Sequence, residues 1–189
     1  MNWQFVSMRQ ISAEPVLIKL VLAKLILAKV WLIVLFFSHN LSASSVALLD
    51  KQGEGEMNYL FWTLYKAEYF IEPQHAVNEQ TSALRITYYK SISKQALIEA
   101  TEDQWRELGY KPMDILLWLE PLKQIWPDVS KGDQLTFVQL ANGAGEFYFA
   151  DQAIGRIDDN GFSSAFLSIW LSENTSEPEL RRQLLGELQ

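Results

Sequence analysis

Two tyrosines and one arginine are the side chains of this sequence best suited to bind a small polar group. Tyr65 lies in an aromatic run at residues 58–71, and Arg85 and Tyr88 lie in the segment Leu84–Tyr89. Tyrosine hydroxyls donate and accept hydrogen bonds, and a guanidinium binds a carboxylate through two parallel N–H groups. Ligand sites are mostly apolar, with a few polar groups that fix orientation. The aromatic run is therefore either the wall of a pocket for an amphipathic ligand or a strand that simply packs against helices.

Arg85 has two interpretations of its own. It is the only arginine between Arg9 and Arg106. On a strand, a charged side chain either faces solvent or is paired inside the protein, because burial of an unpaired charge is costly. Arg85 is therefore either a solvent-facing charge or the single cation of a cavity.

Several other chemistries are excluded by composition. The chain of 189 residues has no cysteine, which excludes disulfides and thiolate metal sites, and its two histidines, His39 and His75, are too few for a multi-histidine centre. Residues 158–161, Asp-Asp-Asn-Gly, lack the spaced acids of a calcium loop and indicate a turn. The net charge of −7 argues against a nucleic-acid partner. We predict no metal, no cofactor and no nucleic-acid binding.

The elements that position these residues are predicted by periodicity and by turn signals. Residues 51–56 indicate a polar Gly-rich turn. The aromatic run at residues 58–71 is predicted to form a long strand, and Leu84–Tyr89 a second strand. The remaining predictions are helices at Lys94–Leu108 and Pro112–Trp126, a hairpin of Gln134–Leu140 and Glu146–Ala150, a short strand at Ala153–Ile157, and helices at Phe162–Leu171 and Glu177–Leu188. Strands with helices gathered between and after them predict the α+β class, with a large antiparallel sheet covered by helices on one face.

Helix ends give three further expectations. Ser93 is a plausible N-cap for the first helix, and Ser176-Glu177-Pro178-Glu179 has the pattern of a capping box for the last. Pro121 is expected to kink or split the helix at Pro112–Trp126, because proline has no backbone N–H to donate.

The amino-terminal segment has a different character. Residues 1–47 combine scattered lysines with an apolar run, Val30–Phe37, and then small residues up to Ala47. A basic start, an apolar centre and a small-residue end are typical of a secretory signal, with cleavage expected after Ala47. An uncleaved membrane anchor and an ordinary buried helix are the alternatives. We predict an exported, periplasmic protein whose domain, residues 48–189, carries 12 Lys and Arg against 22 Asp and Glu, a net charge of −10.

Several segments together resemble the chalcone isomerase superfamily, in particular its bacterial exported members. The clearest match is Phe162–Leu171, which ends in Ser-Ile-Trp-Leu, followed by the helix start at Thr175–Arg182. Leu64–Tyr69, Leu84–Ile98 and the turn Lys131-Gly132-Asp133 are similar to the family's early strand, its strand-then-helix unit and the turn before its late hairpin. The resemblance covers about residues 50–186 and implies an open-faced β-sandwich with a cleft between sheet and helices.

The resemblance also implies two functions, catalytic and non-catalytic. Family enzymes close a flavanone ring with the help of an arginine located just after the Gly-rich turn, and related members hold a fatty acid in the same cleft. In this sequence the corresponding stretch, Gly53–Asn58, has two glutamates and no arginine. A carboxylate would repel the phenolate that the enzymes stabilise. Ser168 falls near a family Ser or Thr that contacts the ligand.

Three functional hypotheses follow. The first is a non-catalytic, exported protein that binds a small amphipathic ligand such as a fatty acid through Tyr65, Arg85, Tyr88 and Ser168. The second is an isomerase acting on an unknown substrate, and the third is a structural or envelope-assembly protein without a ligand. The first is the prediction carried forward, with the membrane contacted only through the amino-terminal segment.

Overall fold

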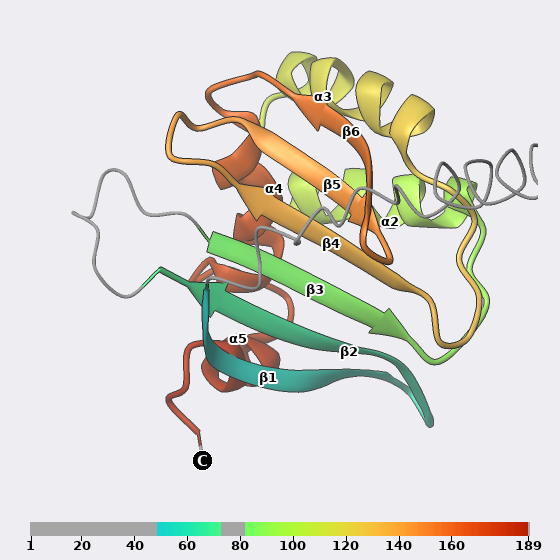
Figure 1. Ribbon diagram of the computed structural model, residues 1–189, viewed down its shortest axis with the longest axis vertical. Coiled ribbons are helices and arrows are strands. Elements are labelled where there is room, and N and C mark those ends of the chain that lie inside the picture. Colours follow the sequence, from blue (N-terminus) through green and yellow to red (C-terminus); the bar gives the residue numbers. More distant parts are fainter. Residues whose placement is uncertain (1–48, 73–81, 189) are drawn as a thin grey trace, which may run out of the picture. The chain divides into compact units, whose positions relative to one another are not determined.

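Six antiparallel strands form one sheet with the strands in sequence order, β1-β2-β3-β4-β5-β6 (Figure 1). The computed structural model describes residues 49–72 and 82–188. The strands are β1 (Asp50–Tyr59), β2 (Trp62–Ile71), β3 (Ser82–Tyr88), β4 (Gln134–Gln139), β5 (Gly145–Phe149) and β6 (Gln152–Ile157). The described helices are α2 (Lys94–Glu107), α3 (Pro112–Ile125), α4 (Phe162–Leu171) and α5 (Pro178–Leu184). The predicted α+β class and the large antiparallel sheet are confirmed.

The main core lies between the helices and one face of the sheet. Alternation along β3 directs Leu84, Ile86 and Tyr88 into this core, and β2 contributes Ala67 to it. Aromatic side chains from the sheet and from α4 fill its centre, where the Phe137 and Phe166 rings lie 4.7 Å apart. The opposite face of the sheet, here called the open face, carries a second, smaller cluster around Phe70, Ala83 and Val138.

The prediction for residues 51–71 was wrong about where the strands begin and end. The expected turn at 51–56 belongs to β1, and the expected long strand is broken by a tight turn at Leu60 and Phe61. Glycine is present in β1 because α5 packs directly against it: a Cβ on Gly53 would lie 2.1 Å from the carbonyl oxygen of Gln183. The Gly-rich sequence reflects this close approach of a helix rather than a turn.

Helix ends match the predictions in part. The Ser93 hydroxyl accepts a hydrogen bond from the Ala96 N–H at 3.2 Å, as expected of an N-cap. The capping box at the last helix does not form: the N-cap of α5 is Glu177 rather than Ser176, and its side chain makes no capping hydrogen bond. The Ser176 hydroxyl donates to the Gln104 side chain at 2.9 Å. Pro121 does not split α3, which continues to Ile125.

The predicted signal segment, residues 1–47, and both histidines lie outside the described residues. Within the described part of the chain, no helix combines the length and the apolar character needed to cross a membrane.

Candidate functional site

Tyr65 and Tyr88 form the centre of the candidate site. They are directly opposite each other on β2 and β3, and their rings meet edge to face with centroids 6.1 Å apart. The Trp170 indole of α4 donates a hydrogen bond to the Tyr65 hydroxyl at 2.9 Å. The structure thus brings two of the predicted residues together on the helix-covered face. It adds Trp170, which was not predicted as a site residue and lies in the Ser-Ile-Trp-Leu segment.

Both tyrosines are held as neutral hydrogen-bond donors. Burial raises the pKa of Tyr65 to about 12, and the nearby Glu177 carboxylate adds to the effect. Burial also raises the pKa of Tyr88, whose side chain is only 3% exposed. Among the described residues, no group accepts the Tyr88 hydroxyl proton. A neutral phenol with a free proton can donate to a carboxylate or a carbonyl oxygen, and this is the chemistry that the pair offers.

Ser168 is turned away from the tyrosine pair. Its hydroxyl donates to the Ala165 carbonyl at 2.8 Å. It also lies 3.1 Å from the hydroxyl of Tyr110, a residue that follows α2 in the chain. Two positions along an α-helix correspond to about 200° of rotation, so Ser168 and Trp170 leave α4 on different sides. Ser168 therefore contacts the helix layer, whereas Trp170 contacts Tyr65.

Arg85 lies on the open face of the sheet, across β3 from the tyrosine pair. Its guanidinium sits over the Phe70 ring, 5.2 Å from the centroid, and its strand neighbours are Glu68 and Thr136. Its Nε is buried without a hydrogen-bond partner among the described residues. The four predicted ligand-binding residues therefore do not form one site. The spacing could have shown this, because positions 85 and 88 of one strand face opposite ways.

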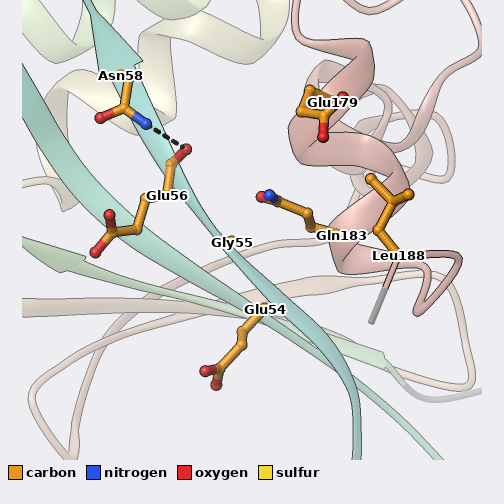
Figure 2. A pocket seen from close by; sticks show the side chains of 7 residues that line it. All are labelled: Glu54, Gly55, Glu56, Asn58, Glu179, Gln183 and Leu188. Atoms are coloured by element: carbon orange, nitrogen blue, oxygen red, sulfur yellow. Dashed lines mark hydrogen bonds between the residues drawn. The ribbon is translucent and has the colours of Figure 1, made fainter.

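A groove along β1 and α5 provides a second concave surface. Its lining residues are Glu54, Gly55, Glu56, Asn58, Glu179, Gln183 and Leu188 (Figure 2). Gln183 points from α5 toward Gly55, whereas the Glu54 and Glu56 side chains point away from α5 (Figure 2). Three carboxylates in the lining make this groove unsuited to an anionic head group.

The carboxylates at the arginine-free stretch of β1 have partners on the open face. Glu54 forms ion pairs with Lys51 and Lys66, and hydrogen bonds from these two lysines lower the pKa of Glu54. Glu56 accepts a hydrogen bond from the Tyr89 hydroxyl at 3.1 Å. Neither carboxylate reaches the tyrosine pair. No group of three or more His, Asp or Glu side chains that could hold a metal ion occurs among the described residues.

Comparison with known proteins identifies the family. A family model described as chalcone isomerase-like matches residues 56–186. The chain belongs to the chalcone isomerase-like family. A protein of Haemophilus influenzae described as uncharacterized is 27% identical over 156 residues, which are 82% of this chain and 75% of that protein.

A solved structure supports the fold of this chalcone isomerase-like chain. The crystal structure of a fatty-acid binding protein from Arabidopsis thaliana has a TM-score of 0.60 and 10% sequence identity, and the match covers 77% of this chain and 90% of that chain. The open-faced arrangement of a large sheet with helices on one face is thereby confirmed.

Proposed function

We propose that this chalcone isomerase-like protein binds a small amphipathic ligand, such as a fatty acid, and does not catalyse a reaction. The observation that carries the proposal is the pair of buried, neutral hydroxyls of Tyr65 and Tyr88 beneath α4. The family's non-catalytic branch and the fold shared with a plant fatty-acid binding protein support it. We also propose that the protein acts outside the cytoplasm, in the periplasm, and the signal pattern predicted for residues 1–47 supports this.

The ligand's position is limited by the aromatic core. Phe137, Phe147, Phe162 and Phe166 contact one another with centroid distances of 4.7–6.0 Å, so the half of the core under β4 and β5 is filled. The tyrosine pair lies at the other half, under β2 and β3, where Tyr65 is only partly buried. The polar head of the ligand would accept hydrogen bonds from the two hydroxyls there, with its apolar tail on the neighbouring aromatic side chains.

Titration of the full chain with palmitate, followed by calorimetry, tests the proposal. Loss of one hydrogen bond to a carboxylate weakens binding by about tenfold or more, and we expect this for Tyr88→Phe. Arg85→Gln is the matched control, because Arg85 lies on the opposite face and its replacement should leave the affinity unchanged. Absence of palmitate binding by the unaltered chain, together with native mass spectra that show no bound small molecule after purification from the host, would overturn the proposal.

Two outcomes point to the alternatives. If Arg85→Gln weakens binding and Tyr88→Phe does not, the ligand lies on the open face rather than under α4. If no small molecule binds and a stoichiometric protein partner is recovered instead, the envelope-assembly hypothesis is favoured.

A further inference from the structure

The turn between β1 and β2 exposes four consecutive apolar residues, here called the hairpin tip. Tyr59 is 61% exposed, Leu60 78%, Phe61 97% and Trp62 59%. Single exposed apolar side chains are common on soluble proteins, but a contiguous cluster marks an interaction site. None of the four belongs to either core cluster of the sheet.

The turn itself does not require these residues. Leu60 adopts a φ of 54°, a left-handed conformation that favours Gly or Asn and costs energy for leucine. The backbone register brings Tyr59 opposite Trp62, so that Leu60 and Phe61 form the apex. The apolar side chains at the apex are thus held there against the local conformational preference of the chain.

The hairpin tip projects beyond the rest of the sheet. The last pair between β2 and β3 is Tyr65 with Tyr88, and the Tyr89 N–H still donates to the Leu64 carbonyl at 2.9 Å. Residues 62 and 63 therefore extend past the last backbone hydrogen bond to this segment by about 7 Å. Figure 1 shows the connection of β1 and β2 reaching past the arrowhead of β3. A projection of this length is enough for shallow insertion into the boundary of head groups and acyl chains.

The order of side chains in the hairpin tip fits a lipid surface. Leu60 and Phe61 at the apex are wholly apolar, whereas Tyr59 and Trp62 behind them carry both an apolar ring and a polar group. Tyrosine and tryptophan are favoured at the level of the head groups, with fully apolar residues beyond them. The Lys90 ammonium lies 4.3 Å from the centre of the Trp62 ring, where it could reach a lipid phosphate.

The charges at this end of the sheet do not oppose approach to a membrane. Lys90, Lys94 and Lys131 follow β3 or precede β4, and no carboxylate of the described residues pairs with them. Nearby carboxylates are engaged: Asp128 accepts a hydrogen bond from the Lys94 backbone N–H, and Asp133 accepts one from Ser130. Glu56 on β1 is the third acid at this end, so three carboxylates accompany three lysines and their charges cancel. The domain as a whole carries a net charge of −10. More distant acids act weakly, because exposed charges are screened beyond about 10 Å.

We propose that the hairpin tip, residues 59–62, inserts into the surface of a phospholipid bilayer, with Lys90 on a lipid phosphate. This contact would be additional to the one predicted for the amino-terminal segment. It goes beyond the proposed ligand binding and does not depend on it, because Leu60 and Phe61 are remote from the tyrosine pair.

A position-specific probe separates insertion of the tip from any membrane contact of the amino-terminal segment. The full chain has no cysteine, so Phe61→Cys and Met113→Cys each give one attachment point for an environment-sensitive fluorophore. Met113 is 75% exposed on α3, and Figure 1 shows α3 at the β6 side of the sheet, opposite the connection of β1 and β2. With vesicles of phosphatidylcholine and phosphatidylglycerol, we expect a blue shift and quenching by nitroxide-labelled lipids at position 61 and neither at position 113. No shift at position 61, or equal shifts at both positions, would overturn the proposal.

Substitutions in the Phe61→Cys background test the chemistry. Replacement of Tyr59 and Trp62 by serine should lower the partitioning of the labelled tip by roughly tenfold, whereas serine at the exposed Leu116 and Leu117 of α3 should change it by less than about twofold. Lys90→Gln should lower it by roughly fivefold on vesicles with phosphatidylglycerol and less on phosphatidylcholine alone. Circular dichroism checks that each variant is folded. A shift at position 61 that appears without vesicles and grows with protein concentration would assign the tip to a second copy of the chain and refute the membrane contact.

Discussion

At the scale of single residues, two buried tryptophans differ in what their indole N–H groups meet. Trp105 is completely buried and donates to the Ala165 carbonyl at 2.8 Å. The Trp126 indole is also buried, but its Nε1 has no hydrogen-bond partner among the described residues. An unpaired buried donor costs free energy, so the two indole N–H groups have opposite effects on stability although both rings pack in similar aromatic surroundings.

The first prediction compares the same substitution at these two positions. Trp105→Phe removes ring volume and a hydrogen bond, and we expect it to lower the free energy of unfolding by about 3 kcal/mol. Trp126→Phe removes a similar volume but also removes the unpaired donor, so the expected loss is about 1.5 kcal/mol. Urea unfolding of both variants measures the difference. Equal losses would contradict the assigned roles of the two N–H groups.

The second prediction concerns alkaline pH. Burial raises the pKa of Tyr65 to about 12 and also raises that of Tyr88, so both phenols ionise less readily in the folded chain than in the unfolded chain. Their contribution to stability is therefore complete below about pH 10 and is lost as the pH rises toward about 12. The free energy of unfolding should fall over this range, and less steeply in Tyr65→Phe.

The exposed Tyr59→Phe variant is the control for loss of a tyrosine hydroxyl, and its stability should fall with pH as in the unaltered chain. Urea unfolding at a series of pH values, with tyrosinate absorbance as a second readout, measures the slopes. A Tyr65→Phe slope identical to that of the unaltered chain would show that the Tyr65 phenol is not held neutral by burial.

At the scale of elements, the contact of β1 with α5 depends on two glycines that differ in their surroundings. A Cβ on Gly53 would lie 2.1 Å from the backbone oxygen of Gln183, whereas a Cβ on Gly55 would meet mainly the Gln183 side chain, with its Oε1 at 2.1 Å. A backbone cannot move aside as a flexible side chain can. A Cβ at position 53 therefore requires α5 to shift, whereas a Cβ at position 55 does not.

The third prediction follows from this difference. Gly53→Ala should destabilise the protein by about 3 kcal/mol because α5 must move, and Gly55→Ala by about 1 kcal/mol because Gln183 can rotate. Thermal unfolding of both variants gives the comparison, and each is the matched control of the other. If Gly55→Ala is the more damaging substitution, α5 does not pack on β1 as described.

The elements that the sequence predicted well have strong local signals. Residues 94–107 have an N-cap serine and a following glycine, and residues 162–171 match α4 at both ends. β1 was missed because an edge strand that alternates glycine with charged residues has the composition of a turn. The turn at Leu60 was missed because it contains no Gly, Asn or Pro, and its left-handed leucine could not be foreseen from turn propensities.

At the scale of the whole molecule, the two faces of the sheet separate the predicted site residues. Tyr65 and Tyr88 could be selected from residue type, but their direct pairing depends on the register of β2 and β3, which the sequence does not specify. The separation of Arg85 from Tyr88 was accessible from strand alternation alone. The contact of Trp170 with Tyr65 joins positions far apart in the chain, and no local sequence pattern predicts it.

The fourth prediction uses this separation of faces and rests on the proposed ligand binding. Met57 pairs with Tyr65 across β1 and β2 and packs against the main core, whereas the neighbouring Glu56 lies on the open face. Met57→Arg would place a guanidinium beside the tyrosine pair, and we expect palmitate to bind roughly tenfold more tightly as a result. Calorimetric titration of the full chain measures this effect.

Glu56→Arg is the control, because it changes the net charge by two units instead of one but on the wrong face. If long-range attraction dominated, Glu56→Arg would tighten palmitate binding more than Met57→Arg does. If the tyrosine pair holds the carboxylate, Met57→Arg alone should tighten it, and Tyr88→Phe should remove most of that gain. The reverse order of the two arginine variants would place the anionic head group on the open face, next to Arg85.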